Sequence, residues 1–190
     1  MIKKCLLHFK KICIHKYWVS YYCFKIGIPW RGIKHDMSKF SPTEFWESVK
    51  YYQGTSSPID TCKAENGWSK AWQHHKGRND HHYEYWVDDL DHGGKPLIMP
   101  FECVLEMFCD YLGAGRAYYG KDFTYQKEYD WWIAKKQNPL LMHPIVQSTI
   151  TEALKICKNF DTLITKRHFR IIYILSLRFF IKDGGGSLYE

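Results

Sequence analysis

Residues 2–29 read IKKCLLHFKKICIHKYWVSYYCFKIGIP, and this stretch decides the fold class of the N-terminal part. Neither Gly nor Pro interrupts it before Gly27, and its apolar side chains recur at helical spacing. Gly27 followed by Pro29 is a typical helix end, because Gly readily adopts the left-handed C-cap conformation and Pro cannot continue the helix. The stretch therefore predicts one long helix, with His8 and His15 on the same face.

The rest of the chain predicts further helices. Ser41-Pro42-Thr43-Glu44 is a capping box with Pro at the first helical position. Periodicity and helix-end signals predict helices over 41–54, 68–76, 81–90, 100–112 with an interruption near Gly113 and Gly115, 122–137, 144–160 and 161–182. Residues 54–67 lack periodicity and indicate a surface loop. No strand signal competes, so we expect an all-α fold: one helical bundle domain over 1–182 and a flexible Gly-rich tail over 183–190.

The composition excludes several classes of protein. Hydrophobic residues make up 45% of the 190 residues and aromatic residues 17%, which excludes disorder and favours one densely packed domain. The longest apolar run, 171–181, contains Arg178 and is about half of what a bilayer requires, so we expect no membrane segment. The net charge of +7 is spread over both ends of the chain, so we do not expect a nucleic-acid partner. The sequence leaves open whether the protein forms a homo-oligomer.

The cysteines indicate the redox environment. There are seven, an odd number, and no two form a CxxC pair. No leader resembling a secretory signal peptide precedes them. We therefore expect reduced thiols and a cytoplasmic protein.

Histidines are concentrated in one part of the chain. Of the ten histidines, five lie between residues 35 and 82, namely His35, His74, His75, His81 and His82. A neutral imidazole is polar at both ring nitrogens, so burying several of them is costly unless each nitrogen has a partner. Asp110 adds a carboxylate within an apolar helix, where it too needs a partner. A metal centre is the simplest explanation of this clustering.

The order of these residues carries a family resemblance. His15, then His35-Asp36, then Asp110 is similar to the ligand order of the HD superfamily of metal-dependent phosphohydrolases. Two sequence motifs, HDMSKFSP at 35–42 and NDHHYEYW at 79–86, resemble those of a little-characterised bacterial and phage branch of HD-like proteins. The resemblance covers residues 15–110 and implies an HD-like helical domain. It also implies that His15, His35, Asp36 and Asp110 bind one divalent ion.

In two-metal members of that superfamily, histidines between the His-Asp pair and the last Asp bind a second ion, with the Asp of the pair bridging. The candidates here are His74, His75, His81 and His82. We favour His75 and His82, because Trp68, Trp72 and His75 follow helical spacing on one face; His81 is nearly as good. Imidazole and carboxylate ligands without thiolate suit Mn, Fe, Co, Ni or Zn, as one ion or two.

The resemblance leaves several functions open. The leading hypothesis is a phosphohydrolase that acts on a nucleotide or another small phosphorylated metabolite, with Asp36 and Lys39 catalytic and Lys39, Arg78, Asn79 and His81 as substrate contacts. Glu44 is explained by its capping box, so no residue is assigned as general acid. The alternatives are an HD-type di-iron oxygenase, a non-catalytic nucleotide-binding protein and a purely structural helical protein.

Overall fold

The protein is almost entirely helical. The computed structural model describes residues 1–182, so the predicted tail at 183–190 lies outside the described residues. Within 1–182 there are nine α-helices, four short 3-10 helices and one two-stranded ribbon. In chain order they are α1 (Ile2–Ile26), α2 (Pro29–Lys34), η1 (Met37–Phe40), α3 (Pro42–Tyr51), α4 (Pro58–Asn66), α5 (Lys70–Lys76), η2 (Tyr83–Trp86), β1 (Val87–Asp88), η3 (Leu90–His92), β2 (Lys95–Pro96), α6 (Phe101–Tyr119), η4 (Gly120–Asp122), α7 (Tyr125–Lys136), α8 (Pro144–Phe160) and α9 (Lys166–Lys182). The all-α prediction is confirmed.

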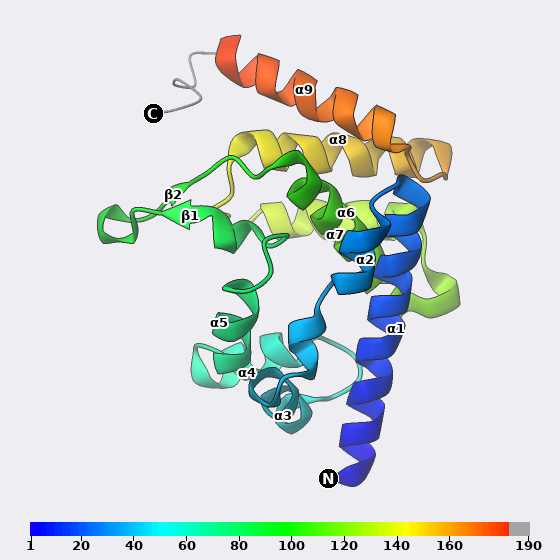
Figure 1. Cartoon of the computed structure of the whole chain (residues 1–190), viewed down its shortest axis with the longest axis vertical. Coiled ribbons are helices and arrows are strands. Elements are labelled where there is room, and N and C mark those ends of the chain that lie inside the picture. The colour runs from blue at the N-terminus through cyan, green and yellow to red at the C-terminus, as the bar shows by residue number, and fades with distance from the viewer. Residues whose placement is uncertain (183–190) are drawn as a thin grey trace.

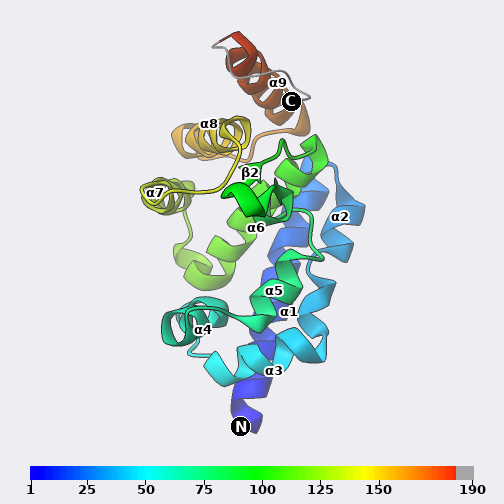
Figure 2. The ribbon, with the colours of Figure 1, turned by 90° about the vertical axis from the view of Figure 1, so that its left-hand side faces the viewer.

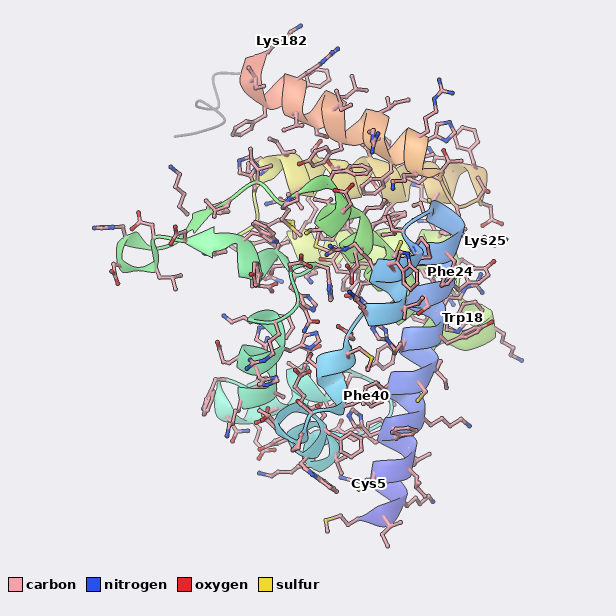
Figure 3. The ribbon with its side chains drawn as sticks, viewed as in Figure 1. Cys5, Trp18, Phe24, Lys25, Phe40 and Lys182 are labelled. Atoms are coloured by element: carbon pink, nitrogen blue, oxygen red, sulfur yellow. The ribbon has the colours of Figure 1, made fainter. Side chains whose placement is uncertain are left out.

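Helix α1 runs along one side of the molecule and is as long as the sequence predicts (Figure 1). It ends at Gly27, whose φ of 87° is left-handed and whose N–H caps the carbonyls of Cys23 and Phe24. The labelled side chains of Cys5 and Lys25 lie toward the two ends of α1, and Phe40 of η1 lies beside it (Figure 3). Since α1 packs against α6 in the core and also against α3, it connects these two parts of the molecule.

Helix α6 packs directly against α1 and is the most buried helix of the described chain. The predicted interruption near Gly113 and Gly115 is wrong, because the helix continues to Tyr119. A Cβ added at Gly113 would lie 2.4 Å from Val19 Cγ2, so the absent side chain allows the two helices to approach closely. Close approach of two backbones, rather than a break, explains this glycine.

Helices α7, α8 and α9 also pack against α6. Of these, α8 and α9 cross the top of the molecule (Figures 1 and 2). The largest fully buried side chains come from this region and from α1 and α6, and include Tyr22, Leu105, Phe108, Leu112, Trp132, Ile150, Leu154 and Phe169. None of the described helices is long and apolar enough to cross a membrane.

Two local predictions are wrong. Residues 54–67, which the sequence pattern predicts as a loop, contain α4. This helix buries only Pro58 and Cys62, so it shows no apolar periodicity. Residues 81–90 form η2, β1 and the start of η3 instead of one helix. The ribbon pairs Val87 with Pro96 and projects from the body (Figure 1).

Helices α3, α4 and α5 form a lobe against the N-terminal half of α1 (Figure 2). The Ser41 half of the predicted capping box at the start of α3 is confirmed, since Ser41 Oγ accepts a hydrogen bond from the N–H of Glu44 at 3.4 Å, but the Glu44 side chain does not return to Ser41. The ring of His8 lies 5.4 Å from that of Phe45 and 5.5 Å from that of Tyr52, which fixes the lobe on α1. The space between this lobe and α6 holds the polar residues that the sequence singled out.

Candidate metal centre

Elements far apart in the sequence bring the predicted ligands together. His15 lies in the middle of α1, and Asp110 lies in α6, which packs on it. His35 and Asp36 form the junction between α2 and η1. Asp36 has a φ of 54°, in the left-handed region that non-Gly residues seldom adopt and that often marks functional sites. The ammonium of Lys16 holds this junction by donating to the carbonyl of His35 at 2.7 Å.

The first group of polar atoms is formed by His15, His35, Asp36 and Asp110, all four buried. His15 Nε2 lies 3.2 Å from Asp36 Oδ2 and 3.1 Å from Asp110 Oδ1. His35 Nε2 lies 3.2 Å and 3.4 Å from the same two oxygens. These are the four residues that the resemblance implies for one ion.

The second group is formed by Asp36, His75, His81 and His82. Asp36 Oδ1 lies 3.2 Å from His75 Nε2 and 3.5 Å from His81 Nε2, and the Nε2 atoms of His75 and His82 are 2.9 Å apart. Asp36 therefore directs Oδ2 to the first group and Oδ1 to the second. Among the four histidines left open by the sequence, His74 is the one that does not join this group.

The spacing and the hydrogen bonding of these atoms fit bound metal. Two ligands at about 2.1 Å from one ion lie roughly 3.0 Å apart at a right angle and roughly 3.4 Å apart at the tetrahedral angle. The distances given above run from 2.9 to 3.5 Å, and all ligand atoms of each group lie within 4.8 Å of one another. Asp36 Oδ1 and His81 Nε2 are both buried without a hydrogen-bond partner among the described residues. A cation between them would satisfy two polar atoms whose burial is otherwise costly.

One carboxylate orients a histidine of each group. Glu106 Oε1 lies 2.8 Å from His35 Nδ1 and 3.3 Å from His81 Nδ1, while the other oxygen of Glu106 accepts from Arg31. Arg31 also pairs with Asp80. A carboxylate on the far ring nitrogen fixes the tautomer and directs Nε2 toward the metal position. Glu106 was missed in the sequence; the available signal was its position one helical turn before Asp110.

Glu44 does the same for the second group. Its carboxylate accepts from His75 Nδ1 at 2.8 Å and from His74 Nδ1 at 2.7 Å. The backbone of Glu44 takes part in the predicted cap, but its side chain points to the histidines instead of returning to the capping residue. Glu44 and His74 are therefore supports of the site.

The carboxylates of the centre stay ionised although they are buried. Burial alone would raise the pKa of Asp36, but His35, Lys39 and His75 hold it well below its usual range. Burial likewise opposes ionisation of Glu106, yet hydrogen bonds from His35 and His81 lower its pKa to about 2. The centre thus concentrates negative charge, which favours cations.

Two separate cavities adjoin the centre. The first, which we call the Lys39 cavity, has a volume of about 210 Å³ and is lined by His15, His75, His82, Asp110 and Lys39. The second, which we call the Arg31 cavity, has about 300 Å³ and is lined by Arg31, His35, Arg78, Asn79, His81 and Glu106. Ligand candidates of both groups line each cavity, and Glu106, which orients two histidines, lines the second.

The predicted substrate contacts divide between these cavities. Lys39 Nζ lies 2.5 Å from Asp36 Oδ2, next to the first group. Arg78 lines the other cavity, so the two predicted phosphate contacts do not face one space. The amide of Asn79 donates to Ser38 Oγ at 2.9 Å and to the carbonyl of His75 at 2.7 Å. These hydrogen bonds connect Asn79 to η1 and α5. His81 belongs geometrically to the second metal-ligand group.

The fold and the site define the class: an all-α protein whose buried His, Asp and Glu side chains could hold metal ions. The chain belongs to the family described as "Family of unknown function (DUF5662)", whose model matches residues 5–156. The match includes every candidate ligand and ends before α9. No curated protein and no solved structure matches the chain.

Proposed function

We propose that this protein is an HD-like, metal-dependent phosphohydrolase that acts on a small phosphorylated compound at a dinuclear centre. The observation that carries the proposal is the bridging position of Asp36, with one oxygen facing each group of ligand candidates. The proposed ligands are His15, His35, Asp36 and Asp110 for one ion and Asp36, His75, His81 and His82 for the other. Mn, Fe, Co, Ni and Zn suit these donors.

When bound, two such ions would lower the pKa of a water to near neutrality and neutralise charge developing on the phosphoryl oxygens. The protein's own contribution begins with Lys39. Burial alone would lower the pKa of its ammonium, but Asp36 and Asp110 raise that pKa above its ordinary value, so Lys39 is charged at pH 7. Its ammonium lies at the edge of the cavity, where it can turn from Asp36 to a phosphoryl oxygen.

The reaction would be ester hydrolysis. A new bond forms between phosphorus and the oxygen of water while the bond from phosphorus to the ester oxygen breaks. The proton lost by water balances the proton gained by the departing alcohol, and inorganic phosphate remains. Lys39 stabilises the negative charge on the phosphoryl oxygens, and Glu106 and Glu44 keep the histidines in the orientation that this chemistry requires.

Metal content and phosphate release test the proposal together. Purified protein is loaded with manganese, analysed for metal and offered a panel of phosphate esters and nucleotides. We expect about two ions per chain and phosphate release, with both reduced in Asp36→Asn and retained in the control Asp88→Asn, an exposed carboxylate on β1. Metal bound without phosphate release from any ester would refute the hydrolase. Iron bound together with oxygen consumption would favour the oxygenase alternative instead.

We also propose a cytoplasmic setting. All seven cysteines are unpaired, and five of them are buried. Free thiols persist where the surroundings are reducing. Localisation of a tagged chain by cell fractionation checks this.

A further inference from the structure

The Lys39 cavity extends along α1, away from the metal-ligand candidates. The side chains of α1 that line it are His8, Lys11, Ile12 and His15, spaced as one face of a helix. His8 and His15 are therefore about 10 Å apart along the helix axis, at 1.5 Å per residue. One rigid element carries both a ligand candidate and a second polar group of the same cavity.

The chemistry of the cavity changes along this face. Next to the ligand candidates it is polar and charged, because the Lys39 ammonium and the carboxylates of Asp110 and Glu44 line it. Farther along, Ile12 of α1, Ile59 of α4 and Ala114 of α6 give it apolar walls. Lys11 donates to the carbonyl of Ala117 at 2.9 Å, so its charge already has a partner in the wall. In Figure 2 the ribbon of α4 lies below the C-terminal end of α6, and both helices contribute lining residues to this cavity.

His8 is an unpartnered polar side chain at the far part of the cavity. Its residue exposure is 6%, and Nδ1 is buried without a hydrogen-bond partner among the described residues. Its ring packs against Phe45 and Tyr52, which contribute no hydrogen bond to it. Because the His8 side chain makes no hydrogen bond among the described residues and lines the cavity, its ring is available to a polar group of a ligand.

The charge state of His8 limits what it can bind. Burial, helped by the nearby charge of Lys39, lowers the pKa of His8 to about 4, so the ring is neutral at pH 7. A neutral imidazole offers one donor and one acceptor but no charge. It matches a hydroxyl group better than a carboxylate or a second phosphate. Ser48, which also lines the cavity, adds another neutral polar group.

We propose that the Lys39 cavity selects a small phosphomonoester whose short apolar body carries a hydroxyl group at the end remote from the phosphate, recognised by His8. This inference rests on the proposed function, because the phosphate is assigned to Lys39 and the metal-ligand candidates. The volume of about 210 Å³ supports a ligand of this size. It is below the roughly 300–1,000 Å³ of cavities that enclose drug-sized ligands, which argues against a nucleotide.

Matched ester pairs test the inference. The substrates are ω-hydroxyalkyl phosphates of two to six carbons, each compared with the n-alkyl phosphate of the same chain length, plus adenosine monophosphate. For manganese-loaded wild type we expect kcat/KM to favour the best hydroxyalkyl ester over its partner about 3- to 10-fold, the effect of one net hydrogen bond. His8→Phe should reduce this ratio to about one, and His8→Gln should keep part of it. His168→Phe, an exposed histidine on α9, is the matched control and should keep all of it.

Binding gives a second readout that does not depend on turnover. Calorimetry with zinc-loaded protein compares the Kd values of the phosphonate analogues of the two esters in each pair, which have no ester bond to cleave, in wild type and in His8→Phe. Phosphate release without any preference for the hydroxyl group would overturn the inference and leave the hydrolase standing, as would a clear preference for adenosine monophosphate. If no ester is hydrolysed, only the hydrolase proposal is refuted. The ratio of the two Kd values then tests the His8 subsite: a preference that depends on His8 supports it, and equal Kd values refute it.

Discussion

Glu106→Gln is the change that most directly tests the geometry of the centre. The side chain touches His35 and His81, one from each ligand group, and Arg31. An amide has the same shape as the carboxylate, but it carries no charge and has only one acceptor oxygen. Glutamine therefore cannot accept both from the histidines and from Arg31 as the two oxygens of Glu106 do. With the amide oxygen on the histidines the NH2 group faces Arg31, and in the reverse orientation the NH2 group faces both rings, so either arrangement loosens the support of both metal positions.

The size of the effect follows from that arrangement. Removing the hydrogen-bond partner of a metal-binding histidine costs 10- to 100-fold in metal affinity, or about 1.4–2.7 kcal/mol. Because His35 and His81 belong to different groups, both binding steps should weaken. A residue that supported only one ion would weaken only one of them.

Competition with a chromophoric chelator measures both dissociation constants for zinc. The affinity is referred to folded, metal-free protein, whose circular dichroism is recorded first, so a loss of fold is seen separately. Glu102→Gln, an exposed carboxylate in the first turn of α6, is the control and should bind like wild type. Affinities of Glu106→Gln within twofold of wild type at both steps would refute the orienting role.

Three further predictions concern stability. Chelation of bound metal should lower the melting temperature by about 16–32 °C, because each of two ions held at 1,000 times its Kd contributes about 4 kcal/mol and each kcal/mol is worth roughly 2–4 °C at this chain length; calorimetry with and without chelator measures it, and an unchanged transition would contradict a metal that binds the fold. Gly113→Ala should destabilise the protein by about 1–3 kcal/mol in urea unfolding, because the new Cβ would lie 2.4 Å from Val19 Cγ2; a neutral result would mean that α1 and α6 are farther apart than described. Burial, with a smaller effect of Asp110, raises the pKa of Glu128 to about 8, so the stability due to its neutral form is complete below pH 4.5 and is lost as pH rises through 8. Glu128→Gln should abolish that loss, on the order of 4 kcal/mol, and a wild type equally stable at pH 5 and pH 8.5 would show that Glu128 ionises normally.

Helix-end chemistry explains which elements could be predicted. The ends of α1 and α8 follow from local signals, a Gly C-cap and an N-terminal Pro, which act within a few residues. Helix α4 carries the same end signals, Pro58 in its first turn and Gly67 at a left-handed C-cap, but it lacks apolar periodicity because only Pro58 and Cys62 are buried. The ribbon at Val87 depends on pairing with a segment beyond η3, which the sequence pattern does not reveal. The ribbon therefore depends on contacts that are not local, whereas the loop prediction at α4 fails because it weighs periodicity above the two end signals.

The candidate site divides in the same way. The residue types that bind metal are unusual in a protein interior, so His15, His35, Asp36 and Asp110 stand out along the sequence, and the fold does bring them together. Glu106 does not stand out, since a glutamate in a helix is ordinary. Its role arises only where α6 faces the 35–36 junction and Arg31. Ligand types can therefore be inferred from sequence, whereas the residues that orient them require the tertiary contacts.

Helix α1 carries both core residues and candidate functional histidines on one helical face. Its buried positions continue without a break in helical spacing from His8, Ile12 and His15 to Val19, Tyr22, Cys23 and Ile26. The second half of this face is apolar and packs in the core, whereas the first half is built largely of imidazoles. If the first half served only to pack, leucine or valine would avoid the cost of burying polar ring nitrogens, of which His8 Nδ1 has no partner among the described residues. Histidine at core spacing is therefore better explained by a cavity whose occupants complete those nitrogens.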